Sequence, residues 1–336
     1  MDLALYVSSL QDRGFLALAG LGGAVLIDLA CGAVFGHRAD PRPVMERLAD
    51  AILFPIASRL NRPGRSDGAL IMRGFMVLVI GCMIFFSVGA GLLHIAREYG
   101  QGGVVMAALV AFSTSALGWF APLRALTRIL ANPAAPRPYM ILARATYSNL
   151  ITLDDSGIIR VAVTAAVRSI VMRLGAPLIL FILFGWQALL VYWPVMALAL
   201  ATGQDGTSRA FAAVTNALAA LFLLIPTLLM FPIVLAALLF SAGASFFRAL
   251  PGFFRVTHWP RMMQGGLPLF LVAHAMKLAL GGPRQDRAGA PVMAAWAGSK
   301  SGTAKLEARD IARVLYLQSV TLLLTVGLLF AFVVLI

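Results

Sequence analysis

The stretch TLDDSGIIRVAVTAAVRSIVMRLGAPLIL, residues 152–180, starts like a capped helix and ends like a membrane span. Thr152 and Asp155 have the spacing of a capping box, and an acidic first turn is favourable at the positive end of a helix dipole. We therefore expect a helix to begin here. The apolar residues that follow, at 174–200, are numerous enough to cross a bilayer.

Basic residues mark one side of this expected helix. Arg160, Thr164, Arg168 and Met172 follow one another at four-residue spacing, so they share one stripe, while small and β-branched residues cover much of the rest. A basic amphipathic helix is typical of the membrane–water interface, where arginines contact lipid head groups. We expect such a helix at the cytoplasmic membrane surface. As the alternative, Arg160, Arg168 and Arg173 bind an anion or an acidic partner.

The composition of the whole chain agrees with a membrane location. Of the 336 residues, 60% are hydrophobic and 12% are charged, and the mean hydropathy is +0.89. Such values lie outside the range of soluble domains. We predict an all-α polytopic membrane helix bundle that forms a single domain over residues 1–336. Apolar runs of about 20 residues predict about six transmembrane helices, at 14–36, 74–96, 103–123, 174–200, 210–247 and 315–336.

Lysine and arginine predict the orientation of this bundle. The net charge is +13, and nearly all of the basic residues lie between alternate spans. The positive-inside rule places these stretches in the cytoplasm and both termini outside. We expect a multi-pass protein of a bacterial-type cytoplasmic (inner) membrane that contacts membrane lipid, with no nucleic-acid partner. The expected cytoplasmic segments, which include interfacial helices, are 37–73, 124–173 and 248–313.

Two apolar runs do not have the form of a simple span. The fifth run is too long for one straight span and contains Pro226 and Pro232, which indicates either a broken, tilted helix or a span joined to an interfacial piece. The apolar piece at 267–282 is short and contains His274 and Lys277. We expect a re-entrant or surface segment there.

One acidic residue, Asp28, falls inside the first predicted span. An ionisable group in a span is costly and is usually paired or functional. Lys277 is a candidate partner, and the alternative is a position near the cytoplasmic end of the span, where water is close. We favour a structural role for Asp28.

Sequence motifs of soluble enzymes are absent. The four histidines have no ligand spacing, and Cys31 and Cys82 both lie in apolar runs, so we predict no metal site, no disulfide and no catalytic residue. The N-terminal residues have no signal-peptide pattern. The loop at 36–68 is typical of an amphipathic helix between two turns rich in proline and glycine, whose arginines contact anionic lipid or a phosphate.

Short motifs in a fixed order nevertheless resemble those of one family, the CobD/CbiB proteins, which are membrane-bound adenosylcobinamide-phosphate synthases of cobalamin biosynthesis. The resemblance extends over nearly the whole chain, and the order and spacing of the pieces carry it. These pieces are LIDLACG (26–32), RPV (42–44), RLN (59–61), LARATYSNLITLDDSGIIRVAV (142–163), APL (176–178), IP (225–226), LGGP (280–283) and LEARDIARVLYL (306–317).

The chain departs from this family where the family has acidic residues. Thr164, Arg168 and Met172 stand where the family helix resembles a row of three acids, Ala199 stands in place of an aspartate, and Leu269 in place of a glutamate. The family joins an aminopropanol moiety to a corrinoid carboxylate, which implies ATP and Mg²⁺. A divalent ion needs several oxygen ligands, and an arginine in their place repels it.

Three hypotheses follow from these departures. In the favoured one, the chain is a non-catalytic CobD/CbiB-like subunit that binds or assembles with a corrinoid, another membrane protein or a further copy of itself. Its contact residues would then be Arg160, Arg168 and Arg173, with Gly281, Gly282 and Pro283 shaping a turn that the family also has.

The second hypothesis is an active, divergent synthase. Its arginines would hold a substrate phosphate, and its Mg²⁺ ligands would come from Asp154, Asp155 or the first cytoplasmic loop. ATP and Mg²⁺ are expected as cofactors only in this case. The third hypothesis is a small-solute transporter, in which Asp28 is the intramembrane site and Pro226 and Pro232 break the moving helix.

Overall fold

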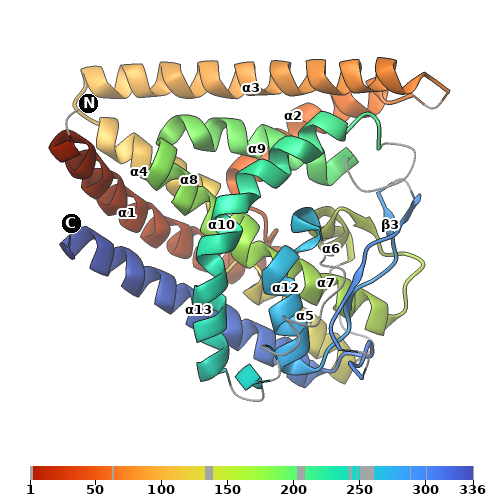
Figure 1. Cartoon of the computed structure of the whole chain (residues 1–336). Coiled ribbons are helices and arrows are strands. Elements are labelled where there is room, and N and C mark those ends of the chain that lie inside the picture. Colours follow the sequence, from red (N-terminus) through yellow and green to blue (C-terminus); the bar gives the residue numbers. More distant parts are fainter. Residues whose placement is uncertain are drawn as a thin grey trace.

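Long apolar helices make up most of the computed structural model, which confirms the predicted all-α membrane helix bundle (Figure 1). The structure describes residues 3–62, 64–132, 139–202, 209–241, 244–247, 249, 261–287, 289–299 and 301–335. Five helices in this part of the chain are long and apolar enough to cross a membrane. They are α1 (Leu3–Phe35), α3 (Asp67–Glu98), the continuous helix Asp155–Phe184, α10 (Ala213–Phe240) and α13 (Ala308–Leu335).

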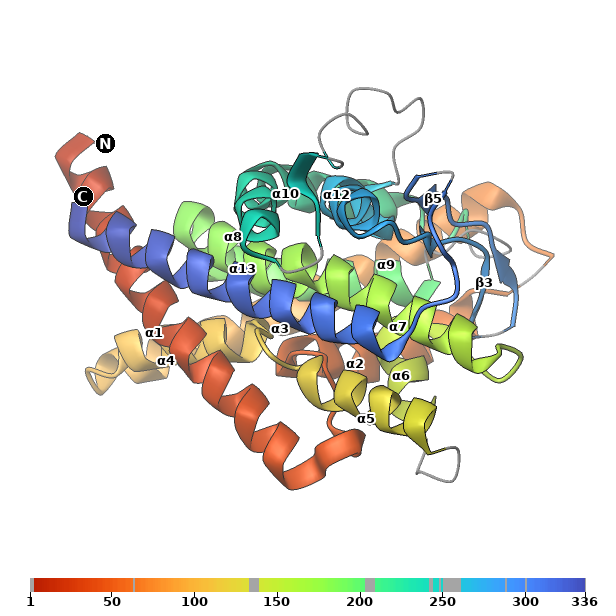
Figure 2. The same ribbon diagram turned by 90° about the horizontal axis from the view of Figure 1, so that it is seen from below.

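The remaining helices are shorter. Figures 1 and 2 both place the N- and C-terminal ends at one end of the bundle. The shorter helices are η1 (Gly36–Arg38), α2 (Val44–Leu60), α4 (Gly102–Ser113), α5 (Phe120–Ala131), α6 (Tyr139–Thr146), α9 (Trp186–Thr202), η3 (Met262–Gln264) and α12 (Gly266–Met276).

Two of the expected spans are interrupted. The run at 103–123 forms the 12-residue helix α4 and the first residues of α5, and the backbone becomes extended at Thr114. The N–H groups that would continue the helix have other partners: Ser115 N donates to the Arg173 carbonyl, and Ala116 N and Leu117 N donate to the Asp28 carboxylate. The run at 174–200 breaks at Gly185, whose φ of +82° is a left-handed conformation typical of a glycine helix stop.

The helix of residues 152–180 runs through the middle of the protein and not along its surface. It consists of α7 (Asp155–Ser169), a π-helical turn η2 (Ile170–Gly175) and α8 (Ala176–Phe184). Every residue of α7 from Gly157 onward is buried except Arg160. The predicted position at the membrane surface is therefore wrong, because α5, α6, α12 and α13 pack around α7 (Figure 2).

Local contacts explain where this helix begins and why it contains a π turn. The N-cap is Asp154, two residues after the predicted start, and its carboxylate accepts from Gly157 N at 2.9 Å. Further along, Pro177 lacks the N–H that an α-helix would direct at the Arg173 carbonyl. Ser115 N donates to that carbonyl at 2.9 Å, and the Tyr192 hydroxyl donates to the Met172 carbonyl at 2.6 Å.

The structure also shows which form the two irregular apolar runs, at 210–247 and 267–282, adopt. α10 is one helix that continues through Pro226 and Pro232. The piece at 267–282 contributes α12, whose residues from Pro268 to Met276 are buried except His274. It is neither a surface helix nor exposed to lipid, because its apolar faces all contact protein: α12 packs against α10 and α7.

Short strands cover one end of α7. A three-stranded antiparallel sheet has the order β1-β3-β4, with Ser148 opposite Asp286, and a second pair joins β2 to β5. These segments lie at the end of the molecule away from the termini (Figure 1). They bring chain segments from before and after α10 onto the same helix. The strands are β1 (Ser148–Asn149), β2 (Leu280–Gly281), β3 (Arg284–Asp286), β4 (Pro291–Val292) and β5 (Trp296–Ala297).

Candidate functional site

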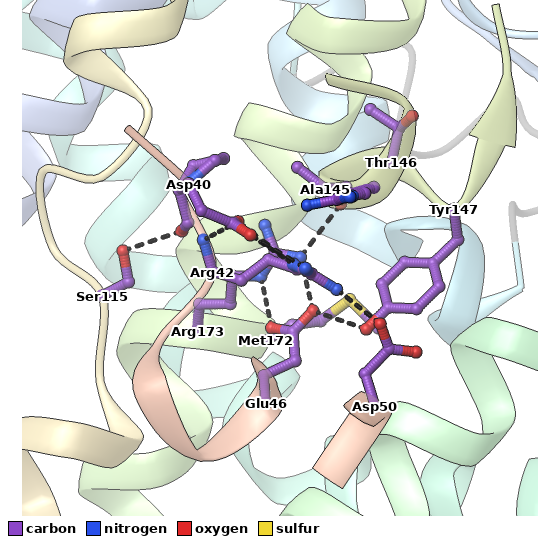
Figure 3. A network of polar contacts seen from close by, with 12 residues as sticks. Asp40, Arg42, Glu46, Asp50, Ser115, Ala145, Thr146, Tyr147, Met172 and Arg173 are labelled. Atoms are coloured by element: carbon purple, nitrogen blue, oxygen red, sulfur yellow. Dashed lines mark hydrogen bonds and ion pairs between the residues drawn. The ribbon is translucent and has the colours of Figure 1, made fainter. Parts of the chain in front are cut away.

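A buried ion pair joins α2 to the π turn. Glu46 has no exposed surface and Arg173 is 4% exposed, and the two side chains form two parallel hydrogen bonds, both of 2.7 Å (Figure 3). The Tyr147 hydroxyl donates to the same carboxylate at 3.1 Å, and Arg173 also donates to the Ala145 carbonyl. A buried ion pair offsets its desolvation cost only when its geometry is good and further hydrogen bonds reach the two groups, which Tyr147 and the Ala145 carbonyl provide here.

A second set of charged residues lies between this pair and the surface, and the two sets together are here called the ion-paired network. Arg42 binds Asp40 through Nε and Nη2, and its Nη1 donates to Asp50 at 2.8 Å. Arg287, just after β3, donates to both oxygens of Asp50, at 2.9 and 2.8 Å. Burial alone would raise the pKa of Asp40, but the hydrogen bonds and charge of Arg42 outweigh it, so the pKa is lowered.

Tyr147 connects the two sets. Its backbone is left-handed, with φ of 54°, and its ring lies between Arg42 and Arg287, at 5.7 and 4.4 Å from their guanidinium carbons. Burial, together with the charges of Glu46 and Asp50, raises its pKa well above the usual value. The hydroxyl therefore stays protonated and serves as a donor to Glu46.

Arg168 lies one turn before Arg173 but has a different environment. It is also 4% exposed, and within the described part of the chain its one direct hydrogen bond is a long one, of 3.4 Å, from Nη1 to the Met263 carbonyl. The ion pairs found in the described residues do not include Arg168. A buried guanidinium without a counter-charge is costly.

Arg168 lines a small cavity beneath the short strands, here called the Arg168 cavity. Its volume is about 20 Å³, enough for about one water molecule. The Nε atom of Arg284 is buried, and burial lowers the pKa of its guanidinium to about 10. The cavity is bounded by Val161, Thr164, Arg168, Gln264, Gly281, Gly282, Arg284, Ala294 and Ala295.

The two glycines of the predicted turn form one wall of this cavity. Gly281 and Gly282 both have left-handed backbones, with φ of +77° and +78°. Gly281 N donates to the Thr164 hydroxyl at 3.0 Å, and a Cβ atom on Gly282 would lie 2.5 Å from the ring of Trp296. The close approach of this turn to α7 therefore requires glycine at both positions.

The other predicted contact residues lie around this wall. Arg160 places its guanidinium 4.8 Å from the centre of the Trp296 ring, and Pro283 is exposed just after the glycine turn. Arg168, Gly281 and Gly282 therefore share one cavity. Arg173 instead belongs to the ion-paired network, so the predicted contact of Arg168 and Arg173 with lipid head groups is wrong.

Asp28 is paired with backbone N–H groups and not with Lys277, the partner considered from the sequence. Its carboxylate accepts from Ala116 N at 2.7 Å and Leu117 N at 2.8 Å, and more weakly from the Ser115 hydroxyl. It thereby satisfies the backbone of the turn that separates α4 from α5. Lys277 is exposed and ends α12 in a left-handed conformation, so it is not the partner of Asp28.

The carboxylates and tyrosine of the network were missed by sequence reasoning. Their arginine partners are distant in the chain: Arg173 lies 127 residues after Glu46. A local signal exists, because Glu46 falls on the same helical face as Ala49, Leu53 and Ala57, which are all buried. An acid on the apolar face of an amphipathic helix predicts a buried partner.

The residues present do not fit the Mg²⁺ site that the family resemblance implies. Among the described residues, no group of three His, Cys, Asp or Glu side chains could hold a metal ion. Asp40, Glu46 and Asp50 are each bound by arginine. Asp154 caps α7, and the Asp155 carboxylate accepts from the Tyr139 hydroxyl.

Comparison of the chain with protein-family models, curated proteins and solved structures finds no significant match.

Proposed function

We propose that this chain is a non-catalytic, CobD/CbiB-like membrane subunit that binds an anionic group of a ligand or partner in the Arg168 cavity. The observation that supports this proposal is the burial of Arg168 without an ion-pair partner among the described residues. The carboxylate whose charge reaches it, that of Glu46, is already bound by Arg173. A bound carboxylate or phosphate oxygen would supply that charge and accept hydrogen bonds from the planar guanidinium group.

The size and surroundings of the cavity limit what can enter. About 20 Å³ admits one terminal oxygen atom or a small group, so the rest of the ligand would lie outside. Ala295 at the edge of the cavity is exposed, and Gln264 and Ala294 are half-buried, so this wall is the entrance. A corrinoid carboxylate is the first ligand to test, because the motifs of the chain resemble a corrinoid-modifying family.

A binding experiment separates this proposal from the synthase hypothesis. Cobyric acid and aminopropanol phosphate would be mixed with the purified protein in detergent, with and without ATP and Mg²⁺, and the red corrinoid followed by absorbance after gel filtration. We expect retention by the native protein, none by Arg168→Met, and no amide product. Formation of the amide would overturn the non-catalytic assignment.

A thermal-shift series with inorganic phosphate tests the anion site independently of any corrinoid. Phosphate should raise the Tm of the native protein and leave that of Arg168→Met unchanged. Arg65→Met, at an exposed position, is the matched control and should respond like the native protein. If neither phosphate nor cobyric acid stabilises the native protein, the cavity is not an anion site.

The proposal includes a location in a bacterial-type cytoplasmic membrane, with the basic segments on the cytoplasmic side. The five apolar helices support the membrane location, and the distribution of lysine and arginine supports the orientation. Labelling of a cysteine introduced at Arg65 by a membrane-impermeant maleimide should require cell lysis. Labelling in intact spheroplasts would show that the orientation is the opposite of the proposed one.

A further inference from the structure

A larger cavity lies between α1, α5 and α13, and it shares no residue with the Arg168 cavity. Its volume is about 630 Å³, within the range of sites for small organic ligands. In Figure 2, α1 and α13 diverge from the termini, and α5 lies beside their far ends. This α1–α5–α13 groove is lined by Asp28, Leu29, Gly32, Ala33, Gly36, His37, Leu117, Phe120, Ala121, Arg124, Ala125, Arg128, Ser319, Leu322 and Leu323.

The walls of the groove are apolar and open outward. Leu29 on α1 is 54% exposed and Leu323 on α13 is 69% exposed, although both helices are long enough to cross a membrane. Exposed leucines on two candidate spans are suited to hydrocarbon and not to water. The groove therefore faces the acyl region of the bilayer along this side.

The opposite end of the groove is basic. Arg124 and Arg128 are exposed and four residues apart on α5, so they project from the same face of that helix. His37 lies across the groove, in the turn that ends the candidate span at Arg38. This places the basic groups at the level where hydrocarbon gives way to head groups.

No carboxylate of the described chain neutralises these groups. The ion pairs among the described residues include neither Arg124 nor Arg128, and α5 contains no acidic residue. The one acid that lines the groove is Asp28, whose carboxylate is occupied by the backbone N–H groups of Ala116 and Leu117. The groove thus combines a free positive end with an apolar wall.

We infer that the α1–α5–α13 groove holds an anionic phospholipid, with its phosphate between Arg124, Arg128 and His37 and an acyl chain against Leu29 and Leu323. Charge complementarity selects the anionic head group, and the apolar wall at bilayer depth selects a lipid over a soluble phosphate. This inference does not depend on the function proposed for the Arg168 cavity.

Three variants of the full-length protein test the charged end, the apolar wall and general electrostatics. Arg124→Gln with Arg128→Gln removes the charged end. Ala33→Trp places an indole in the groove from an exposed position, so the core is left intact. The control, Arg62→Gln with Arg65→Gln, removes the same charge at exposed sites that do not line the groove.

The measurement is lipid binding by native mass spectrometry, after delipidation in neutral detergent and titration with phosphatidylglycerol or phosphatidylcholine. We expect the native protein to prefer phosphatidylglycerol. The affinity should fall about tenfold or more when both α5 arginines are removed. Ala33→Trp should lower it by a similar factor, and the control pair should leave it within about twofold.

Several results would overturn the inference. Equal affinity for phosphatidylglycerol and phosphatidylcholine would mean that the charged end does not select an anionic head group. An equal loss in the control pair would mean general attraction to the surface. Glycerol phosphate competing as strongly as the lipid, or unchanged binding in Ala33→Trp, would mean that the apolar wall takes no part and that a soluble phosphate is the occupant.

Discussion

Arg168 and Arg173 lie one turn apart on the same central helix and have the same exposed fraction, 4%, but they have opposite environments. Arg173 is held by both oxygens of Glu46 and by the Ala145 carbonyl. Arg168 has one long hydrogen bond to a backbone carbonyl and borders a cavity. Burial of an arginine therefore does not indicate its role, whereas the completeness of its partners does. Arg173 completes the fold, whereas Arg168 has no ion-pair partner among the described residues.

Removal of the Glu46 charge should have the largest effect. Glu46→Gln leaves Arg173 buried without a counter-charge, at a cost of about 3–5 kcal/mol in the free energy of unfolding. Unfolding by SDS titration in mixed micelles would measure it. Glu98→Gln, at an exposed surface pair with His94, is the control and should change little. Equal small changes in both variants would mean that the buried pair is unimportant for stability.

Removal of Arg168 should change the free energy of unfolding in the opposite direction. Arg168→Met deletes a buried charge that has no ion-pair partner among the described residues and keeps an apolar side chain of similar length. We therefore expect the free energy of unfolding of the unliganded protein to rise by about 2 kcal/mol. The same SDS titration would show a shift toward higher detergent fractions. A loss as large as that of Glu46→Gln would show that Arg168, like Arg173, completes the fold.

The outer charges should give the network an acid-sensitive component. Because the folded-state pKa of Asp40 is lowered, its contribution is present above its unfolded pKa of about 4 and is lost as the pH falls through the folded value. Asp40→Asn should therefore cost about 1 kcal/mol at pH 7 and progressively less below about pH 4. Unfolding of both proteins across pH 3–7 tests this. A difference that does not depend on pH would contradict it.

The smallest effect concerns the entrance to the cavity. Arg160 lies over the ring of Trp296, which is 50% exposed, and such a contact contributes about 0.5–1 kcal/mol. A double-mutant cycle with Arg160→Met and Trp296→Leu should recover a coupling free energy of this size. A coupling near zero would mean that the two side chains are only neighbours.

Sequence patterns predicted the class of the fold because long apolar runs are visible in the hydropathy of the chain. They did not predict the breaks at Thr114 and Gly185, which depend on a backbone turn held by Asp28 and on a positive φ. They also placed α7 at the surface. A helix with arginines at regular spacing has the same pattern whether lipid phosphate or a buried glutamate receives the charge.

Only part of the candidate site could be predicted from the sequence, because a local pattern does not show which distant residue a charged side chain contacts. The arginines and the glycine turn could be named from local sequence, since each stands in a recognisable motif. The division between Arg168 and Arg173 could not, because it depends on Glu46, Ala145 and Tyr147, which come from other segments. Pairing between distant segments leaves no periodic signal in one sequence.

The π turn at Ile170–Gly175 gives the central helix one place where its length can change. Hydrogen bonds from residue i to i+5 make a π turn hold about one residue more than a turn of α-helix. Deleting one residue within this turn would therefore allow a regular α-helix and leave the buried side of α8, which includes Leu178 and Phe181, directed at the core. A deletion within α7 itself would instead rotate every later residue by about 100°. A single deletion should therefore be tolerated far better in the π turn than in α7.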